Sequence, residues 1–115
     1  MGYIRHDAIV VTSWKSEAIE AAAKEATELG CTVIGPSDGV MNGYRTLLVC
    51  PDGSNEGWDN SEAGDERRER LRAYLTAQRY DDGSSPLEWV ELSYGSDDAK
   101  AEITFTEWRP HDEQD

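Results

Sequence analysis

The sequence is poor in cysteine, in basic residues and in long apolar runs. Its two cysteines, Cys31 and Cys50, have no Cys-x-x-Cys spacing, which excludes a disulfide scaffold and predicts buried thiols in a reducing cytosol. No apolar run approaches the roughly 20 residues of a membrane span, and residues 1–7 contain no signal-peptide core. We therefore expect a soluble protein of the cytoplasm.

Acidic residues greatly outnumber basic ones. Asp and Glu number 24 against 11 Lys and Arg, which gives a formal net charge of -13. Residues 1–50 carry only -2 of this charge, whereas residues 51–115 carry -11. Because an acidic protein is repelled by phosphate backbones and anionic membranes, this composition disfavours nucleic-acid and membrane binding. It favours a basic partner or simple solubility.

Signatures of catalysis are nearly absent. The sequence has no Walker loop, no Gly-x-Ser-x-Gly elbow and no Gly-x-Gly-x-x-Gly after a strand. His6 and His111 have no partner that the sequence places beside them, and nothing near Cys50 would form its thiolate. Glu88 and Glu91 fall on opposite faces of a strand, so they cannot form a carboxylate pair. We expect a non-catalytic protein without a cofactor.

The stretch Asp52–Trp58 is the most metal-like part of the chain. It has oxygen ligands at loop positions 1, 3 and 5 and a glycine at position 6. Ala63 stands at position 12, where a calcium loop needs a bidentate glutamate, and the stretch follows a strand where an EF-hand has a helix. We expect no metal site.

Length and composition fit one globular domain. The chain has 115 residues, of which 37% are hydrophobic, enough for a single core. We expect one domain over residues 1–109 and a disordered acidic tail over residues 110–115.

Hydrophobic periodicity predicts seven elements. The unbroken apolar run Ala8–Val11 predicts a strand buried on both faces, at the centre of its sheet. Ser16 is the expected N-cap of a helix that ends at a left-handed Gly30. If the following turn is centred near residue 40, Cys31 and Cys50 face each other across a strand pair. The expected ranges are strands over 4–14, 31–35, 44–50, 87–94 and 101–109, and helices over 16–30 and 65–79.

The second predicted helix carries five arginines, at positions 67, 68, 70, 72 and 79. These invite a nucleic-acid interpretation, but acids stand three or four residues away on the same helix. The expected pairs are Glu66 with Arg70, Asp65 with Arg68, and Glu69 with Arg72. We therefore expect this charge to form a solvated face, while Leu71, Tyr74, Leu75 and Gln78 point inward.

The element order βαββαββ predicts an α+β fold. It matches a ferredoxin-like sandwich with one added edge strand, in which an antiparallel sheet of order 5-4-1-3-2 carries two helices on one face. This order sorts the loops into two ends. We expect an aromatic and basic end formed by Trp14, Lys15, Tyr44, Arg45, Arg79, Tyr80, Trp108 and Arg109. We expect an acidic end formed by Asp52, Glu56, Asp59, Glu62, Asp65, Glu66, Asp97 and Asp98.

The last hairpin predicts an apolar patch. A turn over residues 95–100 sets Leu87 opposite Trp108 and Trp89 opposite Thr106. If Val90, Leu92, Ile103 and Phe105 face the helices, then Leu87, Trp89 and Trp108 lie on the open face of the sheet and form a homodimer interface. The alternative is that the tail or the long insertion covers this patch.

Several segments resemble small uncharacterised proteins encoded by tailed bacteriophages. They are Met1–Asp7 running into Val11–Trp14, then Asn42–Arg45, Pro51–Ser54, and Asp82–Ser85 before Trp89–Glu91. The resemblance implies expression in the cytoplasm of an infected bacterium. It favours the hypothesis that the protein binds a host protein, including one of antiphage defence that it would inhibit.

Two hypotheses of function follow. The first is a non-catalytic inhibitor whose acidic end binds a basic host protein. The alternative is sequestration of a nucleotide-like small molecule, whose base would stack on the aromatic rings and whose phosphate the arginines would bind. An unrecognised enzyme and a structural or assembly role remain open beside them.

Overall fold

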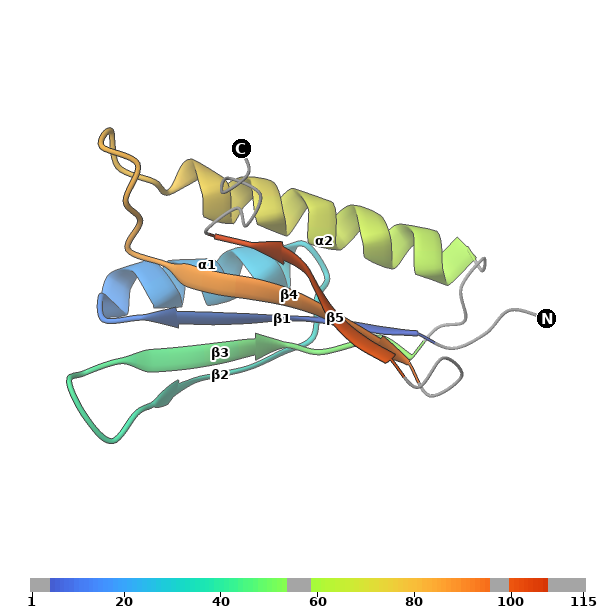
Figure 1. Cartoon of the computed structure of the whole chain (residues 1–115), viewed down its shortest axis with the longest axis horizontal. Coiled ribbons are helices and arrows are strands. Elements are labelled where there is room, and N and C mark those ends of the chain that lie inside the picture. Colours follow the sequence, from blue (N-terminus) through green and yellow to red (C-terminus); the bar gives the residue numbers. More distant parts are fainter. Residues whose placement is uncertain (1–4, 54–58, 96–99, 108–115) are drawn as a thin grey trace.

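The protein folds as one five-stranded sheet with two helices, in the order that the sequence predicts (Figure 1). This computed structural model describes residues 5–53, 59–95 and 100–107. The elements are β1 (His6–Ser13), α1 (Ser16–Glu28), β2 (Val33–Asp38), β3 (Arg45–Val49), α2 (Asp59–Ala77), β4 (Glu88–Gly95) and β5 (Lys100–Thr106).

All neighbouring strands are antiparallel, and β1 lies at the centre of the sheet. The strand order is β2-β3-β1-β4-β5, which reads 5-4-1-3-2 when it is counted from the β5 edge. Ile9 of β1 pairs with Val49 of β3 on one side and with Glu91 of β4 on the other. The unbroken apolar run therefore forms the central strand, as predicted.

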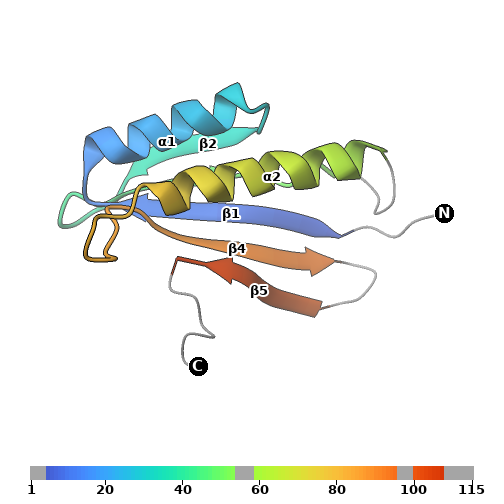
Figure 2. The same cartoon turned by 90° about the horizontal axis from the view of Figure 1, so that it is seen from above.

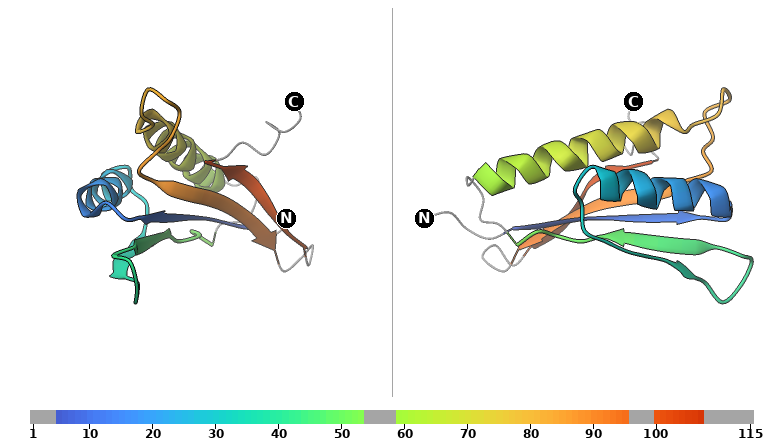
Figure 3. Two further views of the ribbon diagram at one scale, coloured as in Figure 1. Left: turned by 60° about the vertical axis from the view of Figure 1, so that its left-hand side comes forward. Right: turned by 180° about the vertical axis from the view of Figure 1, so that it is seen from behind.

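Both helices lie on the same side of the sheet, and the core lies between the two layers (Figures 2 and 3). Helix α1 runs beside β2 and β3, whereas α2 runs along β1 and β4 (Figure 2). Side chains from both layers meet in one cluster of buried residues. Its members include Ile9, Val11, Ile19, Ala22, Ala26, Leu47, Val49, Leu71, Leu75, Leu87 and Trp89.

Helix α1 packs closely because its inward face is small. Ile19, Ala22 and Ala26 are buried, and Gly30 has the left-handed φ of 99° that the predicted helix end requires. The predicted N-cap is wrong by one residue. Lys15 occupies that position without a side-chain cap, and Ser16 begins the helix.

Helix α2 begins six residues earlier than predicted, at Asp59. The turn-forming residues before Asp65 favour a loop, but the structure continues the helix through them; within this added stretch Gly64 is buried against Asp52, whose Oδ2 would stand 2.5 Å from a Cβ added there. The predicted inward residues are confirmed, since Leu71 and Leu75 are fully buried and Tyr74 and Gln78 are half-buried.

The faces of the β4–β5 hairpin are opposite to those predicted for β4. Leu87 and Trp89 are 1% and 4% exposed and belong to the core under the helices, while Val90 and Leu92 lie on the open face. Leu87 and Trp89 therefore cannot form the expected dimer patch. The expected register holds over residues 92–95. A bulge between Glu91 and Leu92 then shifts the pairing by one residue, so Val90 pairs with Thr106. Trp108 lies outside the described residues.

The reversal of faces follows from Glu91. Apolar alternation alone places either Leu87, Trp89 and Glu91 or Val90 and Leu92 toward the helices, and a buried glutamate argues against the first choice. The structure adopts the first choice because α2 supplies cations to this carboxylate. Ion pairs with residues distant in the sequence thus decided which face of β4 is buried.

Trp89 is buried and Trp14 is exposed, so substitution of each allows a direct test of the hairpin faces. Replacing Trp89 by alanine should lower the free energy of unfolding by about 3–5 kcal/mol, because it empties a core site. Replacing Trp14, whose side chain is 55% exposed, should change it by no more than about 0.5 kcal/mol. Urea unfolding of the two variants measures both values, and equal losses would contradict the hairpin faces described above.

Candidate functional site

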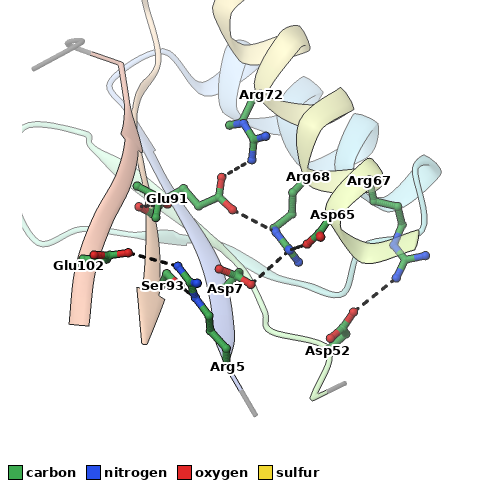
Figure 4. Close-up of polar contacts among 11 residues, drawn as sticks. Arg5, Asp7, Asp52, Asp65, Arg67, Arg68, Arg72, Glu91, Ser93 and Glu102 are labelled. Carbon is green, nitrogen blue, oxygen red and sulfur yellow. Dashed lines mark hydrogen bonds and ion pairs between the residues drawn. The ribbon is translucent and has the colours of Figure 1, made fainter. Parts of the chain in front are cut away.

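A charged groove lies where α2 passes over β1, β4 and β5. Its volume is about 350 Å³, and three arginines and four acids line it together with a threonine and a phenylalanine. Figure 4 shows how Arg68 and Arg72 from the helix meet Asp7 and Glu91 from the sheet. The lining residues are Arg5, Asp7, Asp65, Arg68, Glu69, Arg72, Glu91, Thr104 and Phe105.

The carboxylate of Glu91 is the most buried charge in this groove. Its side chain is 4% exposed, and each of its oxygens has an arginine partner from α2 (Figure 4). Arg68 donates its Nε hydrogen to Oε2 at 3.0 Å, and Arg72 donates to Oε1. Two arginines four residues apart on a helix share one face, which lets them hold a single carboxylate.

Arg68 connects the helix to the central strand as well. Its terminal nitrogen donates to Asp7 of β1 at 3.2 Å and also to Asp65, one turn earlier on α2. The Arg68 side chain is only 12% exposed. One guanidinium therefore links the helix to β1 and to β4.

Arg72 and Arg5 extend the network toward β5. The guanidinium of Arg72 lies over the ring of Phe105, 3.9 Å from its centroid, which is a cation–π geometry. Arg5, from the chain just before β1, donates to Ser93 and to Glu102. The network thus joins α2, β1, β4 and β5 on the side of the sheet that the helices cover.

Burial raises the pKa of Glu91, and the positive charges of Arg72 and Arg68 oppose this effect. Both oxygens of the carboxylate accept hydrogen bonds from arginine, so neither is free to accept a proton from a substrate. The geometry is that of a clamp between two layers, and it gives no support to general-base chemistry at Glu91.

The expected solvated face of α2 is partly wrong. Arg70 does pair with Glu66 at 3.0 Å on the surface, and Asp65 pairs with Arg68. Arg72, expected to pair with Glu69, instead reaches Glu91 in the sheet. A signal was present in the sequence, because Glu91 shares a strand face with Trp89 and the arginines at 68 and 72 flank the inward Leu71.

The acidic end is only partly described. Glu62, Asp65 and Glu66 are exposed on the first turns of α2, and Asp52 lies against the same turns. Asp52 and Arg67 form an ion pair with 3.8 Å between Oδ2 and a guanidinium nitrogen. Positions 56, 97 and 98 and the side chain at 59 lie outside the described residues, so the predictions for Glu56, Asp59, Asp97 and Asp98 stay untested.

The aromatic and basic end does not bring its arginines together. Arg45 on β3 donates to Glu20 at 2.6 Å and to Asp38 at 2.9 Å. Arg79 donates at 2.6 Å to the backbone oxygen of Glu107, beside the end of β5. Because β1 and β4 separate β3 from β5, the two strands lie about 14 Å apart.

The aromatic rings of that end are more accessible. Trp14 and Tyr80 are 55% and 46% exposed, and Tyr44 is 36% exposed. Lys15 is half-buried, and Trp108 and Arg109 fall outside the described part of the chain. The structure therefore supplies exposed rings at this end, but its described arginines are occupied by acids of the same chain.

The cysteines do not pair. Cys31 and Cys50 are both free and half-buried, and Cys50 donates its backbone hydrogen to Thr32, so it stands one position away from the expected facing pair. Both line a small cavity of about 70 Å³ between β2, β3 and α2. Burial raises the pKa of the Cys31 thiol, which leaves it a poor nucleophile at neutral pH.

Among the residues that the structure describes, no three His, Cys, Asp or Glu side chains are grouped as a metal site would need. Within the same ranges, no helix is long and apolar enough to cross a membrane. No protein-family model matches the chain, and no curated protein matches it.

The clamp predicts a difference between two glutamates on the same strand. Glu91→Ala should lower the free energy of unfolding by about 2–4 kcal/mol, because the buried guanidinium groups of Arg68 and Arg72 lose their acceptor. Glu88→Ala is the matched control, since Glu88 is exposed on the opposite face, and it should change stability by no more than about 0.5 kcal/mol. Urea unfolding at neutral pH measures both, and similar effects would contradict the clamp.

The two glutamates should also differ in how they make the stability of the protein depend on pH. Because burial holds the folded-state pKa of Glu91 above its ordinary value of 4.5, the folded protein binds this proton more readily than the unfolded chain. Its contribution to stability should fall as pH rises from about 4.5 through the raised pKa, and Glu91→Gln should lack this slope. Superimposable stability–pH curves for Glu91→Gln and Glu88→Gln would contradict the raised pKa.

Proposed function

We propose that this protein is a non-catalytic binding protein whose acidic surface docks on a basic protein. The supporting observation is that every arginine in residues 5–53, 59–95 and 100–107 has an acidic partner within 4 Å. Positive charge is therefore neutralised inside the chain. The surplus of acids accounts for the field that an approaching partner meets.

The first turns of α2 are the best-supported part of the docking surface. Glu62 and Glu66 are exposed there, and Asp52 and Asp65 lie beside them. Arg67, Arg68 and Arg70 are held by acids of the same region, which leaves Glu62 without a described ion pair. A basic surface would gain most from contact at this end of the helix.

The nature of the partner follows from the resemblance to phage-encoded proteins. On that basis the partner is a basic protein of the bacterial host, and inhibition of an antiphage defence protein in the host cytoplasm is the specific form of the proposal. We also propose that the sheet is a ferredoxin-like sandwich extended by β5, because β1 to β4 have the order 2-3-1-4 with both helices on one face.

Charge neutralisation at one end tests the docking surface. Native capture from a bacterial lysate should recover a basic partner with the unmodified protein. Glu62→Gln combined with Glu66→Gln should then slow association with that partner several-fold at low salt and much less at about 0.15 M salt, where screening acts beyond about 8 Å. Stopped-flow association rates at the two salt concentrations measure this difference.

A variant of equal charge at the opposite end is the control. Glu17→Gln combined with Asp81→Asn also removes two exposed negative charges, from the start of α1 and from the loop after α2. It should slow association less than the α2 variant does. Equal slowing by both would show that net charge acts without a defined surface, and a rate independent of salt would refute electrostatic docking.

Sequestration of a nucleotide-like molecule remains the second candidate, favoured by the exposed rings of Trp14, Tyr44 and Tyr80. If it is correct, a nucleotide from a broad panel should raise the melting temperature of the unmodified protein. Replacing Arg45 and Arg109 by alanine should abolish that rise while leaving the protein folded, because the phosphate loses its donors. The absence of any shift across the panel would reject this candidate.

A further inference from the structure

We propose that the open face of the sheet binds the same face of a second copy of this chain. The register places an apolar stripe there, on the side away from both helices (Figure 3). The stripe crosses all five strands and consists of Ile34, Leu48, Val10, Val90, Leu92 and Ile103. The expected dimer interface thus moves to the other side chains of the same sheet.

This stripe is accessible in the single chain. Ile34 on β2 is 58% exposed and Ile103 on β5 is 61% exposed, while the four residues between them are half-buried. Tyr94 adds a ring that is 41% exposed, and it lies 5.2 Å from the ring of His6. No described segment of the chain lies over these side chains. A contiguous apolar surface of this kind is characteristic of an interface.

Charge is nearly absent from this face, although 30% of the chain is charged. Among the ladder positions of the described strands, Glu88 at the start of β4 is the only carboxylate on the open side. The polar side chains Thr12 and Thr46 satisfy each other through a hydrogen bond of 2.9 Å. Depletion of charge at the centre of a surface, with apolar and aromatic groups retained, is the composition of an interface core.

The lack of charge also identifies the occupant. Among the described strand positions of this face, a basic protein would find a single acid, Glu88 at the start of β4, and a phosphate or nucleotide would find no arginine or lysine. An identical face offers apolar area of equal size and needs no opposite charge, and two sheets packed face to face are separated by about 10 Å, which their side chains fill. A two-fold axis between the sheets closes the assembly at two copies.

The area is sufficient. The strands have five to eight residues each, and each residue occupies about 4.8 by 3.3 Å of the sheet, or about 16 Å². The face therefore covers about 500 Å² in projection, and two copies together bury about 1,000 Å², which reaches the lower limit for a specific interface. Both copies carry a charge of -13, but the acidic first turns of α2 lie on the other side of the sheet.

Substitution at the two edges of the stripe tests the proposal. Light scattering and sedimentation equilibrium of the unmodified protein should give twice the chain mass of 12.8 kDa at micromolar concentration. Ile34→Lys combined with Ile103→Lys should raise the dissociation constant of the dimer by at least about 100-fold, since the ammonium groups buried between the two sheets would have no partner. Both positions are exposed in the single chain, so the variant should keep the circular dichroism of the folded protein.

The control introduces the same two lysines elsewhere. Val40 and Met41, in the loop between β2 and β3, are 96% and 73% exposed, and Val40→Lys combined with Met41→Lys should leave the dimer intact. Raising salt from about 20 mM to about 200 mM should tighten the unmodified dimer, because screening weakens the repulsion between two negatively charged copies.

Two results would overturn the proposal. One is a monomer at about 100 μM protein, well above the dissociation constant expected of a specific interface. The other is equal dissociation by the control variant. This inference does not rest on the proposed acidic docking surface, which lies on the other side of the sheet, so loss of the dimer and loss of partner binding are distinguished by separate variants.

Discussion

The buried carboxylate of Glu91, held by Arg68 and Arg72, is the constraint on which the arrangement of α2 depends. The described part of α2 contributes Leu71 and Leu75 to the buried core, a narrow apolar contact for a helix of 19 residues. A carboxylate that is 4% exposed is costly to bury without partners, so the helix must present both arginines to it. The rotation and register of α2 over β1 and β4 follow from that requirement.

The same constraint determines how the molecule appears to its surroundings. Because Arg68 and Arg72 are directed inward, and Arg67 and Arg70 are held by Asp52 and Glu66, the basic residues of α2 contribute little positive field. The surplus of acids is left on the surface, and the second half of the chain, which carries -11, supplies most of it. A helix with four arginines thus belongs to an acidic surface.

The sheet separates two kinds of chemistry. The face under the helices combines an apolar core with an ionic groove, in which charges from α2, β1, β4 and the residue before β1 pair with one another. The opposite face carries the apolar stripe, almost without charge, because β4 turns Trp89 and Glu91 inward and Val90 and Leu92 outward. The proposed docking of a basic partner and the proposed self-association therefore fall on separate surfaces of the sheet.

Local sequence determined the elements, the central position of β1 and the small inward face of α1, because apolar runs, alanine spacing and a left-handed glycine act over a few residues. It also separated the loops into two ends. It did not determine which face of β4 is buried, where α2 begins, or where the arginines point. Those depend on Glu91 meeting Arg68 and Arg72 from 23 and 19 residues away, and only the folded chain brings such charges within hydrogen-bond distance.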